Sequence, residues 1–316
     1  MHRLICTITL LLLSVFLFAQ DAEDFYDKVW EELDTRNYKK AKLLLDEFIE
    51  AHPDDIEAFS IMSEYYVRTN NLPAGQAHMT NGRKRFGRNP EFYSISAKFN
   101  YSCLQFDQGI RDLNRAMEMT DNDSLRMDFL RQRGDTKSAK RDFEGAYEDY
   151  MVVFAFDSTD ILILNNLGAM ANELGKADQA IDYLQRIIDL DPEFNVSYIN
   201  MGYQYQLMEA HEKALSYFNK AIELVPDDPY ALSNRSYSLL KTGDLKGAMK
   251  DVEKSLKFYP SNSYAYRNRA HIYLAMGKKD KACEDLIAAE NLGFSKMYGP
   301  EVRRLLMMNC LNYKSK

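Results

Sequence analysis

The fold is decided by the stretch NVSYINMGYQYQLMEAHEKALSYFNKAIELVPDD, residues Asn195–Asp228. It holds two runs of apolar residues at helical spacing, joined by a short polar turn. Its Pro226 stands 34 residues after Pro192 and 34 residues before Pro260. A fixed period of this length indicates a repeat architecture. One amphipathic helix pair cannot bury its apolar face alone, so the pairs must stack and share a continuous core.

The same frame fits eight times between residues 22 and 296. The repeats, numbered 1 to 8, are predicted at 22–55, 56–89, 90–123, 127–160, 161–194, 195–228, 229–262 and 263–296. Three extra residues, Ser124–Arg126, separate repeats 3 and 4, and we expect them to bulge from that inter-repeat turn. Residues 297–316 carry an apolar stripe that includes Val302 and Leu305, which predicts a C-terminal capping helix over the open edge of repeat 8.

Three positions of the frame indicate how each helix pair packs. The twentieth position is Ala or Gly in all eight repeats, and the eighth is small in seven of them. The twenty-fourth position is always apolar. Facing small residues allow two helix backbones to approach closely, and the apolar residue fills the space beside them.

With these residues the chain resembles the tetratricopeptide repeat family, exported bacterial type. Repeat 6 matches the family pattern best, through Tyr198, Met201, Gly202, Tyr205, Ala214, Phe218, Ala221 and Pro226. The match is weakest in residues 56–123, where Gly75 and Gly109 replace the usual Ala. The resemblance implies an all-α fold: a right-handed superhelical solenoid of eight helix-turn-helix repeats, followed by the capping helix.

The N-terminal residues are of a different kind. A short basic start precedes an apolar run, Leu4–Ala19, of 16 residues, whereas a bilayer span needs about 20. This pattern predicts a secretory signal peptide at residues 1–19 and export to the periplasm or cell envelope. An uncleaved N-terminal membrane anchor is the alternative, and only then do we expect a membrane partner.

Composition limits the partners. The formal net charge is -7, and the densest basic run is NGRKRFGR at Asn81–Arg88, which suits a helix end. Nucleic-acid binding needs clustered Lys and Arg, so nucleic acid is not expected as a partner.

Arginines occupy the apolar seventh position in three repeats, and each has an Asp sixteen residues later. A buried Arg without a partner would be costly, so we predict three ion pairs between facing helices. The pairs are Arg133–Asp149, Arg235–Asp251 and Arg269–Asp285. Binding of an anionic ligand by these arginines is the alternative.

The cysteines could form a second kind of internal link, a disulfide bond. Cys103, Cys283 and Cys310 would remain after export, an odd number, so at least one is unpaired or pairs between chains. The combination of Cys283 in repeat 8 with Cys310 near the end resembles the last repeat of many exported bacterial repeat proteins, which implies a disulfide between them. Two ordinary buried cysteines are the alternative.

No catalytic motif, cofactor fingerprint or metal-ligand spacing occurs in the sequence, so an enzyme, a cofactor and a metal are not expected. A helical solenoid usually works as a binding surface. In the family that the chain resembles, the first helix of each repeat lines a concave groove through its second, fifth, ninth, twelfth and thirteenth positions. The candidates at these positions are Tyr26, Trp30, Lys98, Tyr101, Arg131, Asn165, Asn172, Tyr203, Tyr230, Tyr237, Tyr264, Arg267 and His271.

Tyr and Trp commonly anchor interfaces, so the expected function is a noncatalytic scaffold that binds a peptide or protein segment in this groove. Two alternatives stay open: a structural assembly subunit that acts through its convex and end surfaces, and a glycan-binding accessory protein. The sequence leaves the oligomeric state open. A ladder of asparagines at the sixth position is expected to form structural hydrogen bonds between helices; its members are Asn166, Asn200, Asn234 and Asn268.

Overall fold

The computed structural model describes residues 22–310, and every regular element in this range is a helix. The predicted signal peptide at residues 1–19 lies outside the described residues. The first helix covers residues 22–34. The others are α2 (Tyr38–Ala51), α3 (Ile56–Arg68), α4 (Leu72–Phe86), α5 (Pro90–Ser102), α6 (Phe106–Glu118), α7 (Asp123–Ala139), α8 (Phe143–Phe156), α9 (Ile161–Glu173), α10 (Ala177–Leu190), α11 (Asn195–Leu207), α12 (His211–Leu224), α13 (Pro229–Lys241), α14 (Leu245–Phe258), α15 (Ser263–Ala275), α16 (Lys279–Asn291), α17 (Phe294–Tyr298) and α18 (Glu301–Asn309).

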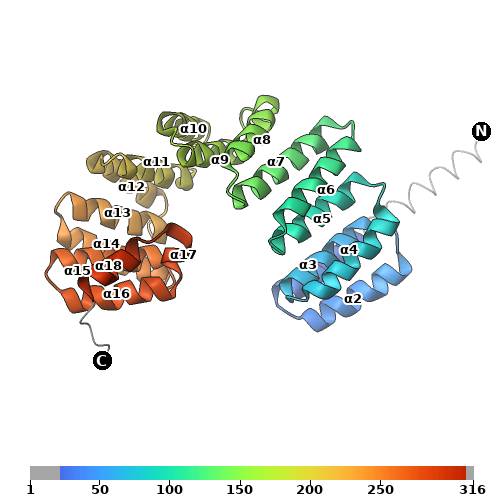
Figure 1. Ribbon diagram of the computed structural model, residues 1–316, viewed down its shortest axis with the longest axis horizontal. Coiled ribbons are helices and arrows are strands. Elements are labelled where there is room, and N and C mark those ends of the chain that lie inside the picture. The colour runs from blue at the N-terminus through green and yellow to red at the C-terminus, as the bar shows by residue number, and fades with distance from the viewer. Residues whose placement is uncertain (1–21, 311–316) are drawn as a thin grey trace, which may run out of the picture. The chain divides into compact units, whose positions relative to one another are not determined.

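The helices form two compact parts, an N-terminal part up to Phe156 and a C-terminal part from Asp157 (Figure 1). In each part consecutive helices pack as pairs, such as α5 with α6 and α13 with α14, and each pair packs on the next. No helix within residues 22–310 is both long enough and apolar enough to span a bilayer. The architecture is therefore all-α, built from consecutively paired helices.

Close packing within a pair depends on the eighth and twenty-fourth positions. A Cβ atom added at Gly202 would lie 2.6 Å from Cε1 of Phe218, and one at Gly134 would lie 2.6 Å from Cε1 of Tyr150. Both distances are shorter than carbon atoms tolerate, so only glycine leaves room for the ring of the facing helix. The core continues from repeat to repeat, because Phe218 also belongs to a buried cluster that includes Ala231 of the next repeat.

The turn between the two helices of each repeat is left-handed at one position. The fifteenth residue of the frame has a positive φ in all eight repeats: Arg36, Asn70, Leu104, Arg141, Gly175, Glu209, Gly243 and Gly277. Only three of the eight are glycine. This conformation costs an L-residue on the order of 1 kcal/mol, so five turns are formed at some cost in backbone energy.

The prediction that Ser124–Arg126 bulge from a turn is wrong. These residues belong to α7, which has 17 residues where the first helix of repeat 3, α5, has 13. The side chain of Asn122 accepts a hydrogen bond from the backbone N–H of Leu125 and so caps the longer helix. A capped extra turn satisfies its own backbone groups, whereas a bulge would leave them to water.

The C-terminal region contains two helices where one capping helix was predicted. Gly293 and Gly299, both at positive φ, flank the short helix α17. The following helix, α18, packs on α16, and its Val302 is fully buried together with Phe294 of α17. The end of the repeat array is therefore covered by α17 and α18 together.

Candidate functional site

The arginines of the seventh position lie where the sequence predicts them. Arg133, Arg235 and Arg269 each make two hydrogen bonds of 2.6–2.9 Å to the carboxylate of the Asp sixteen residues later. Each of these aspartate residues is buried, with 5% exposure or less. The fork of a guanidinium matches a carboxylate in this geometry, so the three pairs join the two helices of their repeats.

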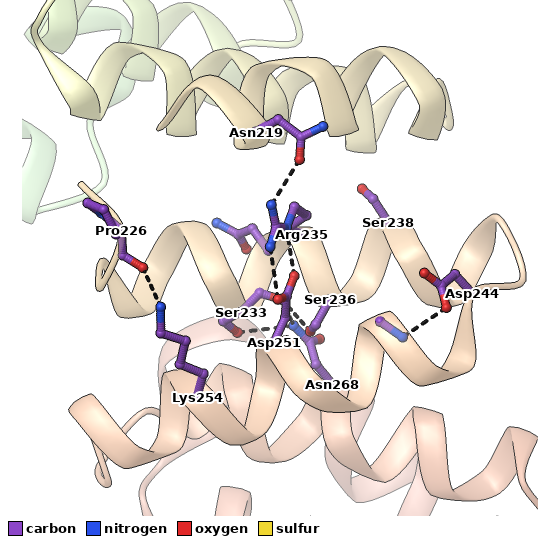
Figure 2. Close-up of polar contacts among 12 residues, drawn as sticks. Asn219, Pro226, Ser233, Arg235, Ser236, Ser238, Asp244, Asp251, Lys254 and Asn268 are labelled. Carbon is purple, nitrogen blue, oxygen red and sulfur yellow. Dashed lines mark hydrogen bonds and ion pairs between the residues drawn. The ribbon is translucent and has the colours of Figure 1, made fainter. Parts of the chain in front are cut away.

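Two of these arginines also reach the preceding repeat. Figure 2 shows Arg235 between Asn219 of α12 and Asp251 of α14, with Arg235 donating to Oδ1 of Asn219 over 2.9 Å. Arg133 donates to Asn114 in the same way. The three arginines therefore act as internal ties between helices.

Asp112 of repeat 3 occupies the same frame position as these three aspartates, but Ser96 stands sixteen residues before it in place of an arginine. Its buried carboxylate accepts hydrogen bonds from Ser96, Asn100 and Gln108, and it forms an ion pair with Arg83 of repeat 2. The sixteen-residue spacing could not reveal Arg83, because that partner comes from the preceding repeat.

Cys283 of α16 and Cys310 at the end of α18 form a disulfide in the structure, with their Cα atoms 5.7 Å apart. Cys103 is a free, half-buried thiol, and burial raises its pKa. The disulfide links the last helix covalently to repeat 8.

Four of the predicted groove residues line one cavity in the C-terminal part. Its volume is about 220 Å³, and it lies on α11, α13 and α15, the first helices of repeats 6, 7 and 8. The four residues are Tyr203, Tyr237, Tyr264 and Arg267. Gln206, His211 and Lys241 also line it, although the sequence prediction did not include them. His211 belongs to the second helix of repeat 6, which the family pattern does not assign to the groove.

Basic groups surround the ring of Tyr237. The Cζ atom of Arg267 lies 4.6 Å from the ring centroid and the Nζ atom of Lys241 lies 5.2 Å from it. The imidazole rings of His211 and His271 lie at 6.0 and 6.1 Å in edge-to-face geometry. Burial, followed by the charge of Lys241, lowers the pKa of His211. The electron-rich ring face of Tyr237 therefore stabilises the cationic groups of Arg267 and Lys241.

Arg267 and His271, both predicted as groove residues, are bonded to α18, one of the two helices that cover the end of the repeats. Arg267 is bonded through Nε and Nη2 to Glu301 of α18 over 2.7–3.1 Å, and the side chain of Arg267 is only 11% exposed. His271 Nε2 lies 3.1 Å from the same carboxylate. Burial would raise the pKa of Glu301, but the bonds from His271 and Arg267 outweigh it and lower the pKa to about 2.

Two predicted residues of the N-terminal part, Trp30 and Lys98, line a different cavity. Tyr26 is close by in sequence but donates to Oδ2 of Asp55 over 2.7 Å. Tyr101 is exposed beside Phe106.

The remaining predicted residues lie apart from both cavities. Arg131 forms an ion pair with Asp128 on its own helix, α7. Asn172 is half-buried on α9. Tyr230 is 54% exposed and packs against Tyr259. Asn165 accepts a hydrogen bond from Asn200 of the next repeat over 2.9 Å.

Two members of the predicted asparagine ladder, Asn200 and Asn268, make inter-repeat contacts of this kind. Besides the bond from Asn200, Asn268 donates to the backbone carbonyl of Ser233 over 2.9 Å (Figure 2). These bonds join first helices of consecutive repeats. Within the described range, no group of three or more His, Cys, Asp and Glu side chains is placed to hold a metal ion.

Comparison with known proteins agrees with this geometry. Family models described as tetratricopeptide repeat match residues 162–194, 210–263 and 252–284. No curated protein sequence matches the chain.

Three solved structures share the fold. A tetratricopeptide repeat protein from Parabacteroides merdae ATCC 43184 is similar with 19% identity and a TM-score of 0.66, over 79% of this chain and 98% of that one. The Cut9–Hcn1 hetero-tetramer of the APC/C is similar with 12% identity and a TM-score of 0.59, over 85% of this chain and 52% of that one. TTC0263, a thermophilic tetratricopeptide repeat protein of Thermus thermophilus, is similar with 16% identity and a TM-score of 0.51, over 58% of this chain and 99% of that one. Together with the paired helices, these matches show that the chain contains tetratricopeptide repeats, matched over residues 162–194 and 210–284.

Proposed function

We propose that this protein is a noncatalytic interaction scaffold, and that it binds a segment of a partner protein in the cavity lined by Tyr203, Tyr237, Tyr264 and Arg267. Tetratricopeptide repeats suggest a protein-interaction scaffold. The finer assignment to this cavity rests on how its side chains are held.

The observation that carries the proposal is the convergence of three tyrosines from three consecutive repeats on one cavity. A tyrosine offers a large apolar face and a polar tip, and it loses little conformational entropy on binding. Aromatic side chains of this kind are the residues that most often dominate the energy of an interface.

The cavity is also preorganised. Glu301 fixes Arg267 from the side of α18, and Arg267 in turn lies over the ring of Tyr237. Tyr264 packs against Phe294 and Tyr298. Side chains that are already ordered cost little to immobilise when a partner binds, so more of the contact energy appears as affinity.

Location is a second part of the proposal: the protein is exported to the periplasm or the cell envelope. The disulfide between Cys283 and Cys310 supports it, because such bonds persist in oxidising compartments. The apolar run Leu4–Ala19 supports it independently. Recovery of the native protein from the cytosol with both cysteines reduced would count against export.

The test compares partner capture by the wild-type protein with capture by Tyr203→Ala/Tyr237→Ala. Tyr230→Ala is the matched control, because Tyr230 is an exposed tyrosine on α13 that does not line the cavity. Arg267 stays unchanged, since its loss would also release Glu301. We expect captured proteins, identified by mass spectrometry and rebound in pure form, to be lost only in the double variant. If both variants retain the same partners, the assembly surfaces outside the groove become the better candidates.

A further inference from the structure

The N-terminal part has a cavity of its own, separate from the proposed binding cavity. Its volume is about 310 Å³, and it is lined by residues of the first helix (22–34), α3 and α5, the first helices of repeats 1, 2 and 3. Trp30 forms one wall, and Glu57 and Glu64 stand on α3. Val67 and Ile95 supply apolar surface. An indole, carboxylates and an apolar surface therefore meet in one hollow.

The surroundings of Trp30 already hold one guanidinium. The Cζ atom of Arg68 lies 5.3 Å from the centroid of the Trp30 ring. Arg68 is fixed there by Asp34 at 2.6 Å and by Glu64 at 2.9 Å. Arg68 does not line the cavity, which opens beside this arrangement. The chain thus shows that this indole and its neighbouring carboxylates accept a guanidinium.

We infer that this cavity binds the side chain of an arginine from a partner protein or peptide. The aliphatic stem of the arginine lies on Val67 and Ile95, and the guanidinium lies against Trp30 within reach of Glu57. Arginine suits such a site better than lysine, because its planar, weakly hydrated head stacks on an aromatic ring and still bonds a carboxylate.

The charges around the cavity decide which side chains matter. Among residues 22–310, Glu57 is exposed and has no ion-pair partner within 4.0 Å, so its carboxylate can receive the ligand. Glu64 is shared with Arg68. Lys98 of α5 also lines the cavity, and its ammonium repels a cationic ligand. Neutralising Glu57 and neutralising Lys98 must therefore change the affinity in opposite directions.

Trp30 is the single tryptophan of the chain, so its fluorescence reports on this cavity alone. The probe is the blocked peptide acetyl-Gly-Arg-Gly-amide, titrated into the full-length protein at constant ionic strength. The control peptide carries citrulline, which has the shape of arginine without its charge. We expect a saturable change in Trp30 emission with the arginine peptide, and binding at least about fivefold weaker with citrulline.

Three variants sharpen the test. Glu57→Gln should weaken binding of the arginine peptide about fivefold, and Lys98→Gln should tighten it about twofold. Glu50→Gln, an exposed acid of α2 outside the cavity, should leave it unchanged. Equal binding of the two peptides, tighter binding by Glu57→Gln, weaker binding by Lys98→Gln, or no binding by fluorescence and calorimetry would each overturn the inference. Because the cavity is in the N-terminal part, these outcomes leave the function proposed for the Tyr237 cavity untouched.

Discussion

Arg267 and Glu301 lie 34 residues apart in the sequence, which is the period of the repeat, and their side chains form a bidentate ion pair. Arg267 is the fifth residue of repeat 8, and Glu301 is the fifth residue that a ninth repeat would have. Helix α18 therefore occupies the position that the first helix of a ninth repeat would have. Its Glu301 carboxylate contacts Arg267. This contact fixes one wall of the cavity in which we propose that a partner binds.

The pH dependence of stability should report this contact. The pKa of Glu301 is lowered from 4.5 to about 2 in the folded protein, so its contribution to stability is present above pH 4.5 and is lost as the pH falls toward 2. Glu301→Gln should cost about 1–3 kcal/mol at pH 7, and the difference from wild type should shrink below pH 4. Urea unfolding followed by circular dichroism measures both values; a difference that does not change with pH would contradict this account.

Removing one partner of the buried Arg235–Asp251 pair should lower the stability of the protein much more than replacing both partners by apolar residues. Asp251→Ala leaves Arg235 without its carboxylate, and we expect a loss of about 3–5 kcal/mol in the free energy of unfolding. The double variant Arg235→Met/Asp251→Leu removes both charges, and its stability should stay within about 1 kcal/mol of wild type. Equal losses in the two proteins would mean that packing, and not the unpaired charge, sets the cost.

The turn of repeat 3 should gain stability from glycine. Leu104 has a φ of 58° and is 74% exposed, so Leu104→Gly removes backbone strain and little packing. We expect a stabilisation of about 0.5–1 kcal/mol. The reverse change at the equivalent position, Gly243→Ala, should destabilise by about 1 kcal/mol, because its added Cβ meets nothing within 4 Å and only the φ of 92° opposes it. Thermal denaturation of both variants checks the opposite signs.

Loss of the disulfide should free α18. Cys310→Ser opens a link between residues 27 apart, which the chain-entropy model values at about 3 kcal/mol. A reducing agent should lower the stability of the wild type equally, and Cys103→Ser should leave this effect of the reducing agent unchanged. Mass spectrometry without reduction should find the wild-type protein lighter by two hydrogens than the same protein after reduction. Equal masses before and after reduction would mean that the thiols are free.

Much of this structure follows from contacts whose sequence separation is constant. The frame places Arg235 and Asp251 on facing helices because every repeat has the same helix and turn lengths, so a sixteen-residue spacing predicts their pairing. The family resemblance, applied to this frame, implied that Tyr203 and Tyr237 lie on first helices that line a groove.

Other features depend on side-chain reach or on departures from the frame. Arg83 reaches Asp112 from the preceding repeat, and many residues at such a distance could have done so. Glu301 lies beyond the last repeat, where no spacing rule assigned it to the cavity. The sequence could not predict the positive φ of Leu104, because a leucine side chain gives no local signal for a left-handed turn.

The most direct test of the central claim is site-specific photo-crosslinking from the cavity. A benzoylphenylalanine placed at Tyr237 should crosslink a partner protein, and the crosslinked peptide should identify the bound segment. The same label at Tyr230, on the same helix but outside the cavity, should not. Crosslinks that form equally from both positions, or from Tyr230 alone, would contradict the proposal that this cavity is the binding site.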